Sequence, residues 1–170
     1  MTRSINLKEY QQRLITRMMA SRERRSEHTR IGFQVGTRRC LLKLEEAEQI
    51  LPVPSICPAP LTQTWFCGLA EVRGEVFGVI DLAEFIEKKK TSNNQDTRLI
   101  IIGQHLGKPS ALMVTKVFGI RHIQKYKMKD KTEDESQWFT NSLIDEDDNE
   151  WLELSINTLI NDEWFSKAQR

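Results

Sequence analysis

The segment from Trp65 to Glu87 constrains the fold of this chain more than any other part of the sequence. It reads WFCGLAEVRGEVFGVIDLAEFIE, in which apolar and β-branched residues lie on both sides of Arg73-Gly74. Such runs are typical of two short strands, and Gly74 favours a tight hairpin between them because glycine tolerates a positive φ. Asp81 occupies the N-cap position of a following helix, where its carboxylate accepts from the first free N–H groups. The segment therefore predicts a strand, a hairpin, a second strand and a short helix.

The length and the cysteine content narrow the class of protein. A chain of 170 residues suits one domain, or two small subdomains that share a core. Its three cysteines have no paired spacing, which favours a reducing compartment over a disulfide framework. No apolar run approaches the roughly 18 to 20 residues that cross a bilayer, and Arg and Glu stand where a signal peptide needs an apolar stretch. We therefore expect a cytoplasmic protein that is neither exported nor embedded.

The rest of the pattern predicts a mainly β chain in two similar halves, each made of strands that end in a short helix. Residues 45–51 fit a helix on propensity alone, and we assign a strand there. Four prolines between Pro52 and Pro60 force an extended surface crossing, and the polar segment 88–97 separates the halves. Five strands and a helix would complete a small closed barrel. Besides the hairpin, strands are expected at 31–35, 39–44, 47–51, 98–102, 111–115, 117–123 and 151–154, and Ser155 caps a last helix.

Charge and periodicity set the N-terminal 30 residues apart. Residues 6–26 have the spacing of an amphipathic helix, with Asn6 and Glu9 as a capping box and one apolar face formed by Leu7, Tyr10, Leu14 and Met18. That face fits packing on the body, binding a partner, or lying on a membrane surface. Residues 1–30 hold eight Lys and Arg against three Glu, and residues 133–150 hold eight Asp and Glu with no Lys or Arg. These runs fit either solvated surfaces or electrostatic docking of partners.

The hairpin segment contains the pattern G-x-x-x-x-R-G-x-x-x-x-x-x-D-L. Its fixed positions are Gly68, Arg73, Gly74, Asp81 and Leu82. This pattern resembles the signature of CheW-like domains, the adaptors of bacterial chemosensory arrays. The preceding W-x-x-G-L-A and Gly78, in place of the usual proline, resemble the PilI-type adaptors of type IV pilus signalling. Glu71 departs from the asparagine that many relatives carry. The resemblance covers about residues 31–165 and is most specific between 50 and 87.

The resemblance implies two small five-stranded β-barrel subdomains with short helices, interleaved along residues 31–165, with an N-terminal extension at 1–30 and a tail at 166–170. It implies a non-enzymatic scaffold without cofactors that couples a methyl-accepting chemoreceptor to a CheA-type histidine kinase in twitching motility, recruited to membrane-associated receptor arrays. The receptor-binding candidates that it implies are Ala47, Gln49, Arg73 and Arg98. The kinase-binding candidates are Ile56, Gly68 and Gly74. A purely structural role also stays open for Arg73, in which its guanidinium binds a carbonyl or carboxylate of a neighbouring loop.

Catalytic and metal-binding patterns are weak. The three histidines lie far apart and none stands at ligand spacing with a cysteine, so we expect neither a metal site nor a catalytic residue. Residues 103–109 imitate a phosphate-binding loop, but the glycine spacing is too short and no Ser or Thr follows the lysine. Asp145, Asp147 and Asn149 imitate a calcium loop, which fails where Glu150 replaces the turn glycine.

Other functions stay open from the sequence alone. The main alternative is a small β-barrel that binds nucleic acid, although aromatics interleaved with Lys and Arg on strands are missing, and Phe33, Phe77 and Phe118 fit a core better. A net charge of +1 also gives little attraction for phosphates. A freestanding kinase regulatory domain and a small barrel hydrolase are further alternatives.

Overall fold

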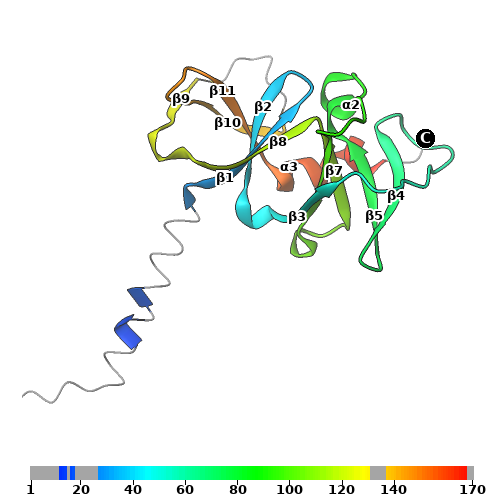
Figure 1. Ribbon diagram of the computed structural model, residues 1–170, viewed down its shortest axis with the longest axis horizontal. Coiled ribbons are helices and arrows are strands. Elements are labelled where there is room, and N and C mark those ends of the chain that lie inside the picture. Colours follow the sequence, from blue (N-terminus) through cyan, green and yellow to red (C-terminus); the bar gives the residue numbers. More distant parts are fainter. Residues whose placement is uncertain (1–11, 15, 18–26, 131–136, 168–170) are drawn as a thin grey trace, which may run out of the picture.

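The computed structural model describes residues 12–14, 16–17, 27–130 and 137–167, and it shows a mainly β protein with two sheets (Figure 1). The six-stranded sheet has the order β8-β1-β2-β11-β10-β9, and the five-stranded sheet has the order β3-β6-β7-β5-β4. The strands are β1 (Thr29–Val35), β2 (Arg38–Lys43), β3 (Ala47–Pro52), β4 (Phe66–Val72), β5 (Glu75–Asp81), β6 (Arg98–Ile102), β7 (Ser110–Val114), β8 (Lys116–His122), β9 (Lys127–Lys129), β10 (Phe139–Ile144) and β11 (Glu150–Leu154). The helices are α2 (Leu82–Glu87), α3 (Ile156–Ile160) and α4 (Glu163–Ser166), with short 3-10 helices η1 (Leu44–Glu46), η2 (Gln104–Leu106) and η3 (Ile123–Lys125).

The hairpin and the helix expected between Trp65 and Glu87 are confirmed. β4 and β5 pair antiparallel around Arg73 and Gly74, which have φ of 54° and 83°. Two consecutive positive φ angles match the right-handed twist of the flanking strands, so Arg73 as well as the glycine takes the left-handed conformation. The Asp81 carboxylate accepts from the backbone N–H groups of Ala83 and Glu84 and thereby caps α2. Ser155 caps α3 in the same way, through the N–H of Thr158.

The two sheets face each other across one apolar core. β1, β2 and β11 of the six-stranded sheet contribute Phe33, Leu42 and Leu154, while β5, β6 and β7 contribute Ile80, Ile100 and Leu112. Helices α2, α3 and α4 close this core with Phe85, Leu159 and Phe165. Inside it, the ring centroids of Trp65 and Phe85 lie 5.1 Å apart at nearly a right angle, an edge-to-face geometry that aromatic pairs prefer.

Each sheet also curls around a small core of its own. Phe118 of β8 touches Trp151 of β11 with centroids 5.6 Å apart, although β1 and β2 lie between these strands in the sheet order. This contact requires strong curvature. On the other sheet, Leu51, Val53 and Ile56 pack against the apolar outer face.

The expectation of two closed five-stranded barrels is wrong in its detail. One sheet has six strands, and among the described residues no strand pairing joins β8 to β9 or β3 to β4. The chain itself connects these edges: η3 links β8 to β9, and the proline-rich crossing 53–65 links β3 to β4. An isolated bridge between Cys57 and Leu69 fastens that crossing to β4. Prolines cannot donate backbone hydrogen bonds, which explains why this closure is mostly side-chain packing.

Both sheets take strands from each side of the segment 88–97. The six-stranded sheet contains β1 and β2 from before this segment and β8, β9, β10 and β11 from after it. The five-stranded sheet contains β3, β4 and β5 from before it and β6 and β7 from after it. The connections are made by the parallel pairs β2–β11 and β5–β7 and by the antiparallel pairs β1–β8 and β3–β6. The two sheets are therefore interleaved along the chain.

A buried ion pair lies where the N-terminal extension meets the body. Arg30, which we expected in the extension, lies in β1 and is 8 % exposed. Its Nε is 2.5 Å from Oε1 of Glu153 on β11, and its Nη1 donates to the backbone oxygens of Glu27 and Thr29. Removing one partner from such a pair leaves a buried charge and costs about 3 to 5 kcal/mol. The pair thus ties the start of β1 to the far end of the chain.

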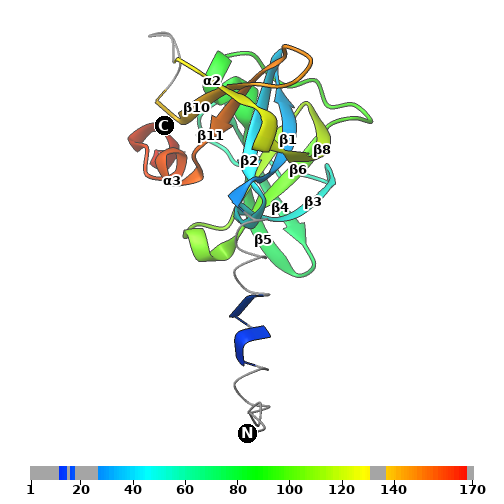
Figure 2. The same cartoon turned by 90° about the vertical axis from the view of Figure 1, so that its left-hand side faces the viewer.

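The expected N-terminal helix lies mostly outside the described residues. Residues 12–14 and 16–17 are helical and exposed, and they project away from the two sheets in Figures 1 and 2. Leu14 is 43 % exposed, so it does not pack on the body. Leu7, Tyr10 and Met18 lie outside the described ranges. Within those ranges, no helix is both long and apolar enough to cross a lipid bilayer.

Asp81 is expected to be a strong determinant of stability. Its side chain is buried and also accepts from the backbone N–H and the hydroxyl of Thr91, so Asp81→Ala leaves four donors without an acceptor. We expect a loss of about 3 kcal/mol in the free energy of unfolding, measured by urea denaturation. Asp96→Ala, at an exposed position, is the control and should change little. Equal stability of the two variants would contradict this assignment.

Candidate docking surface

The apolar core reaches the surface along two sheet edges. Ile120 on β8 lies opposite Ile31, and Ile50 on β3 lies opposite Ile100, so both follow rows of core residues out to an edge. Ile120 is 60 % exposed and Ile50 is 38 % exposed. Ala47 and Val117 are partly buried against the same core. We call Ala47, Ile50, Val117 and Ile120 the edge patch.

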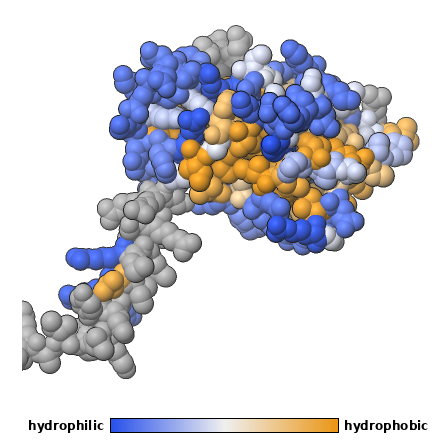
Figure 3. Space-filling view, viewed as in Figure 1, coloured by the Kyte–Doolittle hydropathy of each residue, from blue (hydrophilic) through white to orange (hydrophobic). Residues whose placement is uncertain are grey.

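The edge patch belongs to a broad apolar area on one face of the molecule. Figure 3 shows this area across the middle of the face on which β3 and β8 lie in Figure 1. Both ribbon views place β3 and β8 on the same side of the body. Apolar areas with polar rims are typical of protein interaction sites.

The structure brings three of the four receptor-binding candidates to one end of the five-stranded sheet. Ala47 and Gln49 lie at the start of β3, beside a register shift that bulges the strand. Arg73 lies at the tip of the β4–β5 hairpin, which extends beyond that same end. Arg98 pairs with Pro52 at the opposite end, and its guanidinium already donates to the backbone oxygens of Gln95 and Thr97.

Arg73 is exposed and strained. Its positive φ is unfavourable for a residue with a side chain, by roughly 1 to 2 kcal/mol. Within the described part of the chain its guanidinium makes no hydrogen bond or ion pair, so it does not hold a neighbouring loop. An open pocket of about 440 Å³ lies nearby. It is lined by Glu45, Glu48, Glu75, Gly103, Gln104 and His105. The hairpin tip therefore carries a free guanidinium beside an acidic hollow.

The kinase-binding candidates have different surroundings. Ile56 is half-buried, packed on the outer face of the five-stranded sheet. A Cβ on Gly68 would lie 2.1 Å from the backbone oxygen of Cys57, and φ at Gly68 is 129°. A side chain there would break the bridge between the crossing and β4. By contrast, a Cβ on Gly74 would meet no atom within 4 Å. Gly68 is required by the fold, whereas Gly74 leaves space at the hairpin tip.

Sequence reasoning missed Ile50 and Ile120 as site residues. Both are ordinary apolar strand residues, and only the sheet order shows that β3 and β8 are edges. The available sequence signal was that Ile50 stands two residues from Glu48 and from Pro52, and alternate residues of a strand share a face.

The acidic loop that resembled a calcium site is internally satisfied. Asp145 accepts hydrogen bonds from the backbone N–H groups of Asp147 and Asn149, from the Asn149 amide and from the indole N–H of Trp151. Burial opposes its ionisation, but the hydrogen bonds from Trp151 and Asn149 outweigh that effect and lower the pKa of Asp145 to about 2. Within the described ranges, no three His, Cys, Asp or Glu side chains are grouped so that they could hold a metal ion.

Two other carboxylates near β3 and β11 show opposite effects. Burial raises the pKa of Glu46, which immediately precedes β3. Burial also opposes ionisation of Glu153, but hydrogen bonds from Asn141 and Arg30 outweigh it and lower the pKa of that group.

Burial raises the pKa of the Cys67 thiol to about 11, so this cysteine is a poor nucleophile at neutral pH.

Comparison with known proteins agrees with this architecture. The family model of the CheW-like domain matches residues 30–163, and the chain therefore belongs to the CheW-like domain family. A solved structure, the scaffolding protein TtCheW from Thermoanaerobacter tengcongensis, superposes with a TM-score of 0.68 at 20 % identity, over 81 % of this chain and 94 % of that one. This likeness establishes the fold.

The chain also matches two curated bacterial relatives over part of their length. The chain is 29 % identical to Protein PilI of Pseudomonas aeruginosa over 111 residues, or 65 % of this chain and 62 % of that protein. It is 29 % identical to Protein FrzA of Myxococcus xanthus over 101 residues, or 58 % of this chain and 61 % of that protein. The matched regions span about three fifths of each relative. The recognition of a CheW-like domain similar to PilI is confirmed.

The two hairpin glycines provide a matched pair of substitutions. Gly68→Ala should destabilise the protein by several kcal/mol, roughly 3 or more, because the methyl group collides with the Cys57 backbone at an already positive φ. Gly74→Ala meets open space and should cost only about 1 kcal/mol of backbone strain. Chemical denaturation of both variants measures the difference. A Gly68→Ala protein as stable as Gly74→Ala would refute the packing described for the crossing.

The acidic loop should contribute to stability in a pH-dependent way. Because folding lowers the pKa of Asp145 from 3.8 to about 2, its contribution is complete above about pH 4 and is lost as the pH falls through about 2. The free energy of unfolding of the wild type should therefore fall more steeply than that of Asp145→Asn between pH 5 and pH 2. Asp147→Asn, an exposed neighbour, should follow the wild type. Parallel pH profiles for the wild type and Asp145→Asn would contradict the prediction.

Proposed function

We propose that this protein is a non-enzymatic scaffold that couples a methyl-accepting chemoreceptor to a CheA-type histidine kinase. The observation that carries the proposal is the CheW-like domain match over residues 30–163. Similarity to PilI favours a role in type IV pilus and twitching-motility signalling. The work of such a protein is geometric, since it holds two macromolecules at a fixed spacing.

The edge patch supports a helical partner. An amphipathic helix buries an apolar stripe in an apolar surface, and Ile50 and Ile120 offer exposed apolar side chains on two neighbouring edges. Arg73 adds a charged donor at the hairpin tip, where a rigid turn holds it. A receptor's helical tip would contact Ala47 and Gln49 along β3 and reach Arg73 at the end of the sheet. Arg98 remains a candidate at the other end.

The kinase would engage the opposite edge of the five-stranded sheet. Next to Ile56 and Gly68, the crossing and β4 expose Leu61 and Leu69 by 83 % and 44 %. Leu61 also has a positive φ of 59°, an unfavourable conformation for leucine, on an exposed loop. Gly68 would serve this surface indirectly by keeping the crossing close to β4. Each such contact is modest, and assembly into arrays would supply avidity.

The alternative of nucleic-acid binding has less support. Phe33 and Phe77 are buried at 0 % and 2 % exposure, so they are unable to stack on bases. Phe118 is half-buried, with Lys116 and Arg121 near its ring. The expectation that Phe33 and Phe77 belong to the core is confirmed.

Co-purification with the receptor and the kinase tests the proposal. Ile120→Glu should weaken receptor recovery by about tenfold or more, because a carboxylate replaces a central apolar contact. Arg73→Glu should weaken it as well. Met128→Glu, a 68 % exposed apolar residue on β9, is the matched control and should leave both partners bound. Unaltered recovery of both partners with Ile120→Glu and with Arg73→Glu would refute the adaptor role.

A further inference from the structure

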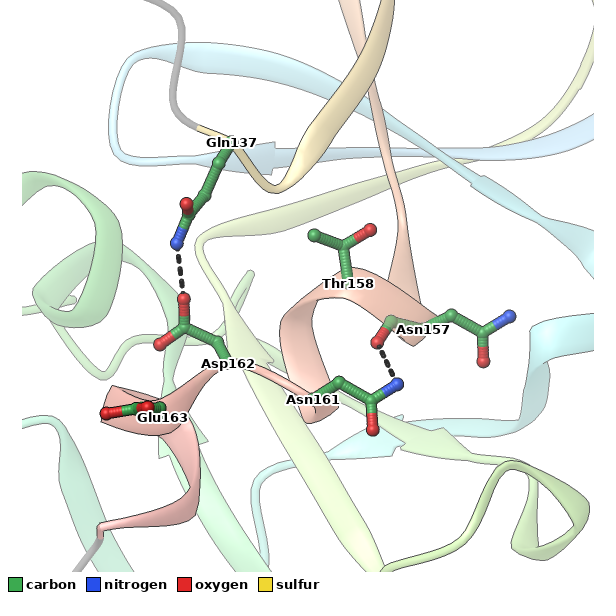
Figure 4. A pocket seen from close by; sticks show the side chains of 6 residues that line it. All are labelled: Gln137, Asn157, Thr158, Asn161, Asp162 and Glu163. Carbon is green, nitrogen blue, oxygen red and sulfur yellow. Dashed lines mark hydrogen bonds between the residues drawn. The ribbon is translucent and has the colours of Figure 1, made fainter.

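A polar pocket lies at the two C-terminal helices, on the other side of the body from the edge patch. Its volume is about 570 Å³. The pocket is lined by Gln137, Asn157, Thr158, Asn161, Asp162 and Glu163 (Figure 4). Figure 2 places α3 on the side of the body opposite β3. A partner bound at the edge patch therefore leaves this pocket open.

A buried carboxylate fixes the wall of the pocket. Asp162, 9 % exposed, stands between α3 and α4 and accepts from the Gln137 amide and from the indole N–H of Trp138, both on Oδ2. Its Oδ1 lies 3.4 Å from the backbone nitrogen of Phe165. These bonds hold Gln137, which comes from the strand side, against the helices.

The same bonds determine which atoms the pocket offers. Gln137 turns its amide nitrogen to Asp162, and Asn161 turns its amide nitrogen to the backbone oxygen of Asn157 at 2.8 Å. Each amide oxygen therefore points away from that internal acceptor (Figure 4). The Thr158 hydroxyl bonds to Ser155 at 2.9 Å. The remaining polar surface offers mainly oxygen acceptors, together with the side-chain amide nitrogen of Asn157.

The Glu163 carboxylate gives this acceptor-rich surface a negative charge. Its side chain is 87 % exposed, and its ion pair is with Lys167, one helical turn away, at 3.3 Å. Exposed pairs of this kind contribute little and exchange readily. Glu163 is thus available to a cationic ligand at the rim of the pocket.

We propose that this pocket binds the guanidinium group of an arginine side chain presented by a protein partner. A guanidinium is planar and carries five N–H donors and no acceptor, so it matches a pocket that offers the Glu163 carboxylate and the amide oxygens of Gln137 and Asn161. An ammonium group is more strongly hydrated and offers fewer donors in a fixed plane, which makes it the weaker ligand. The contact would be additional to the proposed receptor and kinase surfaces.

A peptide titration of the full chain tests this site. The probe is a blocked tripeptide with a central arginine, and the matched control is the same peptide with citrulline, which keeps the shape and removes the charge. We expect amide NMR shifts at Asn157, Thr158 and Asn161 with the arginine peptide only, at a Kd of about 1 mM in low salt. Equal shifts with citrulline, or shifts confined to Glu45, Glu48 and Glu75, would overturn the proposal, because the latter pocket is also acidic.

Substitutions at the rim give a second readout without disturbing Asp162. Glu163→Gln should weaken the arginine peptide about threefold, as loss of one exposed charge pair predicts. Glu48→Gln, which removes a charge from the other pocket, should leave the titration unchanged. Unchanged affinity in Glu163→Gln would show that this carboxylate does not hold the guanidinium, and an equal loss in Glu48→Gln would show that the peptide responds only to overall charge. Either result would overturn the proposal.

Discussion

The packing of the two sheets against one apolar core is the interaction on which the rest of the structure depends. Phe33, Leu42, Ile100 and Leu112 meet there with almost no exposure. Each sheet has apolar side chains on both faces, so neither is stable in water alone. One face of each sheet packs against the other sheet. The opposite face of each sheet curves around a small separate core. The helices α2, α3 and α4 then cover the remaining side of the shared core.

This arrangement also produces the candidate docking surface. A row of core residues that runs across a sheet has to end at an edge strand, where one side chain is left partly uncovered. Ile120 ends the row that begins with Leu42 and Ile31, and Ile50 ends the row that contains Ile100. The apolar surface is therefore the exposed end of the core. A partner that covers it extends the same packing, which explains how such a surface can bind specifically.

Local chemistry made much of the fold predictable. The Arg73-Gly74 turn and the Asp81 and Ser155 caps depend on a few neighbouring residues, and all were predicted with the correct partners or positions. Strands with continuous apolar runs, such as β6 and β7, were found for the same reason. β9 and β10 were missed because polar residues interrupt them. β9 is exposed and places Met128 between two lysines, and in β10 the half-buried Asn141 and the buried Ser142 donate to Glu153 and Glu150, which no pattern of hydropathy reveals.

Long-range pairing was the part that the sequence did not provide. The sixth strand of one sheet, the parallel pairs and the identity of the edge strands depend on contacts between distant segments. Asn161 and Asp162 lie between α3 and α4 and divide the expected last helix in two, and the Asp162 side chain accepts from the backbone N–H of Phe165 in α4. For the site, the resemblance supplied Ala47, Gln49 and Arg73, and the structure places them together, while Ile120 required the sheet order.

The parallel pairing of β2 with β11 has a consequence for synthesis of the protein. Cys40 pairs with Leu152, so the strand that completes the middle of the six-stranded sheet leaves the ribosome last. The five-stranded sheet ends at Val114 and has all its strands much earlier. During translation, the nascent chain therefore carries β1 and β2 with one open flank and unburied core residues. This exposed intermediate makes late translation the stage at which the chain is most vulnerable to aggregation and most dependent on chaperones.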